Sequence, residues 1–166
     1  MSHIHKKIDY TADALIVCGN RVLLRMHEKY HMWLAVGGHI ELDEDPNKAL
    51  MREVKEEVGL DIEMIVPPRD SNPDFYPNDP SFHWLIPPRF MNRHKISETH
   101  DHISLYYLAT ARFTDIQPAA GEPITECHWF SAEELDEPQW KIWPHMRFYA
   151  QRAIIEVNAA GPTPAV

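Results

Sequence analysis

The segment that decides the fold is Gly37-Gly38-His39-Ile40-Glu41-Leu42-Asp43-Glu44-Asp45, then residues 46–51, then Arg52-Glu53-Val54-Lys55-Glu56-Glu57-Val58-Gly59-Leu60. Asp45 can cap a helix, Pro46 suits the first helical position, and Gly59 suits a C-terminal stop. The sequence therefore predicts a helix from about Pro46 to Val58 that follows a glycine-rich turn.

Three carboxylates share one face of this predicted helix, because Glu53, Glu56 and Glu57 are spaced at i, i+3 and i+4. Such a face is unfavourable unless solvent or a cation neutralises it. Carboxylate oxygens at this density suit Mg²⁺ or Mn²⁺ better than zinc, and the carbonyl of Gly38 or its neighbours can add an oxygen. From spacing alone, a solvent-facing acidic helix with Lys55 as a partner remains an alternative.

The full pattern resembles the Nudix box, which reads Gly, five residues, Glu, seven residues, then Arg-Glu-apolar-any-Glu-Glu-any-Gly-apolar. Every specified position is matched, by Gly38, Glu44, Arg52, Glu53, Val54, Glu56, Glu57, Gly59 and Leu60. The strands before the box, the Trp129-Phe130-Ser131 segment and the closing helix are also similar to Nudix domains. The resemblance implies an α+β fold, the Nudix-type α/β/α sandwich with a mixed β-sheet.

The resemblance also implies roles for these residues. Glu53, Glu56 and Glu57 would be metal ligands together with Gly38, and Arg52 would orient the helix by pairing with Glu44. Glu53 would also assist removal of a proton from water.

The family often adds one more glutamate from a loop before the Trp-containing strand. Glu122 and Glu126 both lie in that stretch, and we favour Glu122 because Gly121 and Pro123 predict a loop around it.

The implied reaction is attack of a metal-activated water on a pyrophosphate bond, with Mg²⁺ as cofactor and Mn²⁺ as a substitute. The substrate would be a nucleoside triphosphate or a nucleoside-diphosphate-linked compound. Its base and leaving group are not determined by the sequence, nor is a housecleaning role distinguished from a metabolic one.

Two other functions remain open. A Nudix-like domain can bind a ligand without hydrolysing it, although such domains typically lose box carboxylates. An enzyme like isopentenyl-diphosphate isomerase would need a catalytic cysteine, and neither Cys18 nor Cys127 has a suitable local context.

Outside the box, the sequence predicts strands at 12–18, 21–26, 33–36, 60–66, 102–113 and 126–130, and a closing helix at 144–157. Half of the chain's 14 prolines fall in residues 67–88. We therefore expect a long ordered insert at about 67–100, with a short strand at 82–86. The tail after 158 is expected to be loose. We interpret residues 1–166 as one domain.

Substrate contacts are also predicted outside the box. Arg89 and Arg93 lie in the one locally basic stretch and offer forked donors to phosphate, although a solvated loop explains them equally simply. Trp33, with Tyr30, could stack on a base, and an ordinary core role is the alternative for Trp33.

His94, His100 and His102 lie close together in sequence with Glu98 and Asp101. Their spacing matches no established zinc pattern, so we interpret them as surface or strand-start histidines.

The composition limits the partners. A net charge of −9 argues against a duplex nucleic-acid binder but allows a small nucleotide-type substrate held by cations. No apolar run is long enough to span a membrane, and the first residues do not resemble a secretory signal. Two widely separated cysteines indicate free thiols in the cytoplasm. The oligomeric state, monomer or homodimer, is not determined.

Overall fold

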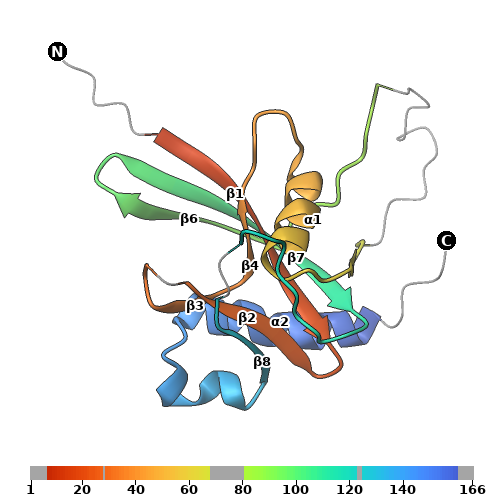
Figure 1. Cartoon of the computed structure of the whole chain (residues 1–166), viewed down its shortest axis with the longest axis vertical. Coiled ribbons are helices and arrows are strands. Elements are labelled where there is room, and N and C mark those ends of the chain that lie inside the picture. The colour runs from red at the N-terminus through yellow and green to blue at the C-terminus, as the bar shows by residue number, and fades with distance from the viewer. Residues whose placement is uncertain (1–6, 28, 68–80, 123–124, 161–166) are drawn as a thin grey trace.

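The structure, a computed structural model, describes residues 7–27, 29–67, 81–122 and 125–160 (Figure 1). Along the chain these form β1 (Lys7–Cys18), β2 (Arg21–His27), β3 (Met32–Leu34), β4 (Val36–His39), α1 (Pro46–Glu57), β5 (Ile62–Met64), β6 (Phe90–Ser97), β7 (His100–Ala111), β8 (Cys127–Ser131) and α2 (Pro144–Ala160). Two short 3-10 helices, Glu134–Asp136 and Pro138–Trp140, precede α2. The strands form one sheet with parallel and antiparallel pairs.

Strand β1 organises this sheet. It pairs in parallel with β7 from Lys7↔His100 to Val17↔Thr110, and its opposite edge is shared by two antiparallel strands. Strand β4 pairs with residues 11–14, whereas β2 pairs only with residues 17 and 18. Strands β2 and β4 therefore diverge from the same edge of β1.

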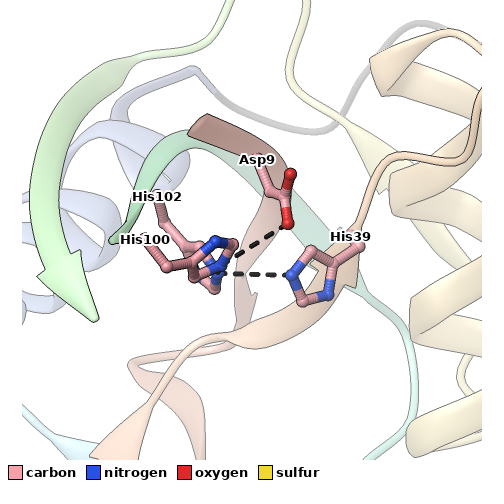
Figure 2. A group of neighbouring side chains, drawn as sticks. All are labelled: Asp9, His39, His100 and His102. Carbon is pink, nitrogen blue, oxygen red and sulfur yellow. Dashed lines mark hydrogen bonds and ion pairs between the residues drawn. The ribbon is translucent and has the colours of Figure 1, made fainter. Parts of the chain in front are cut away.

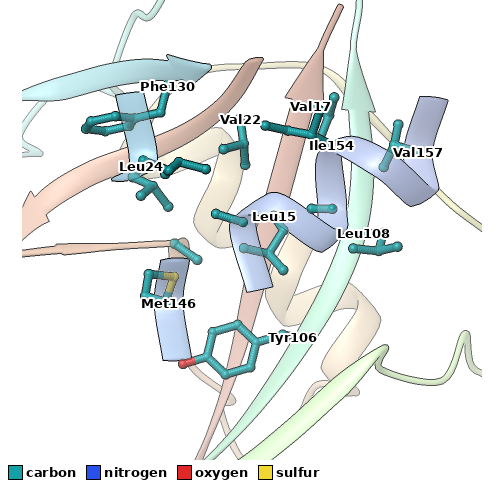
Figure 3. Close-up of a cluster of buried hydrophobic side chains, with 14 of the residues drawn as sticks. Leu15, Val17, Val22, Leu24, Tyr106, Leu108, Phe130, Met146, Ile154 and Val157 are labelled. Atoms are coloured by element: carbon teal, nitrogen blue, oxygen red, sulfur yellow. The ribbon is translucent and has the colours of Figure 1, made fainter. Parts of the chain in front are cut away.

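The core lies in two layers, one on each face of the sheet. Alternate residues of a strand point to opposite faces. Leu15 and Val17 accordingly pack in a cluster with α2, which Figure 3 shows, and Ala14 and Ile16 pack in a second cluster with α1. The mixed sheet between two helices confirms the predicted α/β/α sandwich.

Helix α1 begins where the sequence predicts. The Asp45 carboxylate accepts hydrogen bonds from the backbone amides of Asn47 and Lys48, both at 3.0 Å. Leu50 and Val54 are completely buried, which is worth roughly 1.5–3 kcal/mol for each side chain. These contacts fix the helix against the sheet, so its carboxylates are held toward β4.

The structure differs from the sequence prediction in the insert and in the tail. No strand forms at 82–86, while residues 90–97 form β6, which pairs with β7 as an edge strand. Most β6 side chains are exposed, so the strand lacks the hydrophobic alternation that would have predicted it. Residues 68–80 of the predicted insert lie outside the described residues. Helix α2 continues to Ala160, beyond the predicted end at 157.

Among the described residues, no helix has both the length and the apolar character needed to cross a membrane.

Candidate active site

A cavity of about 700 Å³ opens where β2 and β4 diverge, and it is lined by residues of β1, β2, β4, α1, β6 and β7 and by the start of α2. This volume suits a nucleotide-sized ligand. Its wall combines acidic, basic, aromatic and histidine side chains with two glycines, and it includes Asp13, Arg25, Gly38, His39, Glu53 and Glu57. Glu53 and Glu57 come from α1, whereas Asp13 comes from β1.

The Glu53 carboxylate lies directly against the backbone of Gly38. A Cβ atom at Gly38 would be only 2.6 Å from the carboxyl carbon of Glu53, so a side chain there would displace that carboxylate. At Gly37, whose φ is +153°, a Cβ would meet the carbonyl oxygen of Ala12 at 2.2 Å. The two glycines therefore let β4 approach both α1 and β1 closely.

Glu57 is held from two sides. Its carboxylate accepts a hydrogen bond of 3.0 Å from the Gly37 amide and forms an ion pair with Arg25. Burial nevertheless raises the pKa of Glu57 to about 7. The attraction of Arg25 lowers this pKa, and repulsion from Glu53 and Asp13 opposes that attraction.

Asp13 contributes a third carboxylate to the cavity. Burial raises the pKa of Asp13 to about 7, with repulsion from Glu53 adding to the effect. The Thr11 hydroxyl donates a hydrogen bond of 2.8 Å to the Asp13 carboxylate and partly offsets this rise.

Arg52 connects the helix to the turn before it. Its guanidinium donates to both carboxylate oxygens of Glu44, at 3.1 and 2.6 Å, so the pair expected from the sequence is present. It also donates to Glu53 at 2.8 Å, to Glu56 at 3.0 Å and to the carbonyl oxygen of His39 at 3.0 Å. One guanidinium thus orients three carboxylates and the end of β4.

The donor set fits a hard divalent cation. Carboxylate oxygens of Asp13, Glu53 and Glu57 face one cavity. Burial, with repulsion among these carboxylates as a smaller cause, raises the pKa of Asp13 and Glu57, so a bound cation would offset the cost of keeping them ionised. Glu56 is placed differently, because its side chain is 42% exposed and it does not line the cavity. Its role as a ligand stays a prediction.

The extra glutamate predicted between β7 and β8 also stays a prediction. Glu122 is exposed in a turn whose Ala119 amide donates to the carbonyl oxygen of Glu56, at the last turn of α1. Glu126 is exposed just before β8. Neither side chain lines the cavity.

The predicted substrate contacts are not brought to the cavity. Trp33 is only 3% exposed and packs edge-on against Phe130 and Trp140, so a base cannot stack on it. The core role that the sequence left as an alternative is the one observed. Arg89 forms an ion pair with Glu156 on α2, and Arg93 pairs with Asp101, so both guanidinium groups are already engaged.

Sequence reasoning missed Asp13 and Arg25. The signal was present, because each is a charged residue inside an otherwise apolar strand, and a buried charge needs a partner or a function. In the strand predicted at 12–18 the residues other than Asp13 are apolar, so the pattern predicts a buried strand rather than a functional site.

The two cysteines do not line the cavity, although Cys127 is opposite Arg25 in the pairing of β2 with β8. Cys18 ends β1, and Cys127 begins β8 with a pKa raised by burial, which disfavours the thiolate. Neither lines the cavity, so the described residues offer no support for cysteine chemistry there.

Comparison with known proteins identifies the fold and the family. A hydrolase of the NUDIX family from Clostridium perfringens is 31% identical with a TM-score of 0.78, and the match covers 90% of this chain and 97% of that chain. An Ap4A hydrolase from C. elegans (18% identity, TM-score 0.60, 91% and 98% coverage) and an ADP-ribose pyrophosphatase from Streptococcus suis (16%, 0.53, 93% and 94%) share the fold. No curated protein matches the chain. A family model described as the NUDIX domain matches residues 9–151, and since this span includes the complete box and most of the sheet, the chain belongs to the NUDIX family.

Proposed function

We propose that this protein is a divalent-metal-dependent hydrolase that cleaves a pyrophosphate bond in a nucleoside triphosphate or a nucleoside-diphosphate-linked substrate. One observation carries the proposal: the carboxylates of Asp13, Glu53 and Glu57 converge with Gly38 on a single cavity of nucleotide size. The same proposal treats the chain as one domain, since a single sheet uses strands from Lys7 to Ser131.

Glu53 and Glu57 would hold Mg²⁺, or Mn²⁺ in its place, with Asp13, Glu56 and the Gly38 carbonyl as further oxygen donors. When bound, such an ion supplies positive charge to the phosphate oxygens and makes a nearby water more acidic. Arg25 and Arg52 would keep the carboxylates in position, because each guanidinium is already bonded to them.

The chemical step would use Glu53 as the proton acceptor. As the water oxygen bonds to phosphorus, its proton passes to the Glu53 carboxylate, and the bond between that phosphorus and the bridging oxygen breaks. The products are a nucleoside monophosphate and the other half of the substrate. Phosphoryl transfer depends mainly on positioning and charge neutralisation, which this set of residues can provide.

Two exposed aromatic side chains would receive the base. Tyr30 and Trp143 line the cavity and are 39% and 52% exposed, so their rings are accessible to a ligand. Stacking on either ring would be worth about 0.5–1.5 kcal/mol beyond the area buried. Tyr30 and Trp143 would therefore have the base-stacking role for which the sequence offered Trp33 together with Tyr30.

The test is turnover of a defined panel: the nucleoside triphosphates, Ap4A and ADP-ribose, each with Mg²⁺ and with Mn²⁺. Release of nucleoside monophosphate identifies cleavage, and reaction in ¹⁸O-labelled water shows which phosphorus is attacked. The Glu57→Gln variant should lose activity, whereas Glu63→Gln, at an exposed position of strand β5, is a matched control that should keep it. Nucleotide binding without turnover under either metal would instead favour a non-hydrolytic ligand-binding domain.

A further inference from the structure

A cluster of three histidines and one aspartate, here called the histidine cluster, lies at the end of the sheet where β1, β4 and β7 meet. It consists of Asp9, His39, His100 and His102 (Figure 2). Their ligand atoms all lie within 4.8 Å of one another. Of these four residues, only His100 and His102 lie close together in sequence, and their spacing alone predicts surface or strand-start histidines.

Strand register explains how distant residues meet. Asp9 of β1 is opposite His102 of β7, and Thr11 of β1 is opposite His39 of β4. Residues two apart in a strand point to the same face, so His100 and His102 lie on one side with Asp9. The sheet itself therefore presents the four side chains together.

The hydrogen bonds within the histidine cluster do not satisfy all of its ring nitrogens. The Nε2 atom of His102 lies 2.9 Å from Nε2 of His100 and 3.3 Å from Nε2 of His39. A ring nitrogen carries either one hydrogen or one lone pair, so Nε2 of His102 cannot form good hydrogen bonds with both of these neighbours. Three converging Nε2 atoms are better explained by a shared cation than by mutual hydrogen bonding.

The distances also match a known coordination geometry. Zinc bound at about 2.0–2.1 Å by four tetrahedral ligands requires ligand–ligand separations of about 3.3 Å. The two nitrogen separations at His102 are 2.9 and 3.3 Å, and an Asp9 carboxylate oxygen lies 3.4 Å from Nε2 of His100. The remaining pairs of ligand atoms lie within 4.8 Å of one another, so the four side chains would move closer together to place one ion at equal distance from all of them.

We propose that Asp9, His39, His100 and His102 bind one transition-metal ion, with Zn²⁺ as the best fit. Imidazole nitrogens suit Zn²⁺, Co²⁺ and Ni²⁺, whereas Mg²⁺ prefers the oxygen donors at Asp13, Glu53 and Glu57. The site is therefore separate from the proposed catalytic cation, and it does not rest on the proposed function.

An anion fits the cluster less well. The Asp9 carboxylate faces the three rings and would repel a phosphate, while the same carboxylate is a favourable ligand for a cation. His39 and His102 also line the cavity. A bound ion would thus connect β1, β4 and β7 at the cavity wall and make this part of the wall less flexible.

The experiment is a titration of metal-free full-length protein with Zn²⁺ and with Co²⁺, in excess Mg²⁺ to occupy the carboxylates and without substrate. We expect one equivalent of either ion to bind, Co²⁺ to give the intense visible absorption of a tetrahedral complex, and the melting temperature to rise on binding. His100→Ala and His102→Ala should each weaken Zn²⁺ binding at least about 10-fold. Asp9→Asn, on an exposed carboxylate, should weaken it without threatening the fold.

Three controls make the assignment specific. His145→Ala removes a cavity histidine outside the cluster and should leave Zn²⁺ affinity unchanged. Glu53→Gln should also leave it unchanged, which separates this site from the carboxylates. Replacing His3 and His5 by alanine should do the same, which excludes a site in the first residues.

Equal Zn²⁺ affinity in the wild type and in folded His100→Ala, His102→Ala and Asp9→Asn variants would overturn the proposal. So would an octahedral Co²⁺ spectrum, or binding of inorganic phosphate in place of metal. Because no substrate is present, none of these outcomes depends on whether the protein hydrolyses nucleotides.

Discussion

The carboxylates of Asp13, Glu53 and Glu57, here called the carboxylate cluster, and the histidine cluster open on the same cavity but differ in chemistry. The carboxylate cluster offers oxygen atoms and is ion-paired to Arg25 and Arg52. The histidine cluster offers ring nitrogens and one carboxylate, and repulsion from His39, His100 and His94 adds to burial in lowering the pKa of His102 to about 4. One cavity wall can therefore present two sets of donors with opposite metal preferences.

His39 joins the two clusters. Its carbonyl oxygen accepts a hydrogen bond from Arg52, while its imidazole lies 3.3 Å from His102. It also follows Gly38, against which Glu53 packs. Because this strand end contacts both clusters, the unchanged Zn²⁺ affinity expected for Glu53→Gln is a direct test of their separation.

The largest expected effect is on catalysis at the carboxylate cluster. Glu53→Gln removes a charge that lies 15% exposed in the cavity, and kcat in saturating Mg²⁺ should fall on the order of 10²–10³-fold. Glu56→Gln, at a side chain 42% exposed, should cost less than about 10-fold. Equal losses would place Glu56 among the essential groups and contradict the distinction drawn between them.

How far the sequence could predict these clusters depends on how each is assembled. Glu53 and Glu57 follow from the period of one continuous helix, whereas the Arg52–Glu44 pair, whose Glu44 lies in the turn before α1, follows from the resemblance to the Nudix box. Asp9 and His102 are 93 residues apart and meet only because β1 and β7 pair in parallel at that register. Nothing in a local pattern specifies that register. Strand β6 was not predicted for a related reason. It forms by pairing with β7 and lacks the alternation of hydrophobic residues by which a strand is recognised in sequence.

The next effect distinguishes the two adjacent glycines. Gly38→Ala should lower kcat by about 10-fold or more, because the new methyl group displaces the Glu53 carboxylate. The side chain of Glu53 can move aside, so the melting temperature should change little. Gly37→Ala would clash with the backbone of Ala12 and should destabilise the fold by about 1–3 kcal/mol.

Thermal melts and kcat measured on both variants check this prediction. A Gly38→Ala protein with full activity would show that the close approach to Glu53 is not needed for catalysis.

A smaller effect concerns pH. The pKa of Asp13 is raised from 3.8 to about 7, so the folded protein binds more protons than the unfolded chain between these values. The stability due to this proton is fully present below pH 3.8 and is lost as the pH rises through about 7. The metal-free protein should therefore lose stability from Asp13 between about pH 4 and pH 7.

Asp13→Asn removes this titration while keeping an acceptor for the Thr11 hydroxyl. The variant should be less sensitive to rising pH, and its melting temperature at pH 8 should exceed that of the wild type by about 2–4 °C. The histidines, including His102, are common to both proteins, so their contribution cancels in the difference. Parallel pH curves for the two proteins would contradict the raised pKa.

The smallest expected effect concerns base stacking, and it distinguishes between Tyr30 and Trp33, the two residues that the sequence offered for this contact. Tyr30→Ala should raise KM for the preferred nucleotide by about 3–10-fold, corresponding to loss of a stacking contact, with kcat nearly unchanged. Trp33→Phe should instead lower the melting temperature and leave KM alone, because the Trp33 ring contacts Phe130 and Trp140 in the core. If Trp33→Phe raised KM while Tyr30→Ala did not, the base would bind against β3 in a conformation that exposes the tryptophan. The assignment of Tyr30 to the base-binding wall of the cavity would then be wrong.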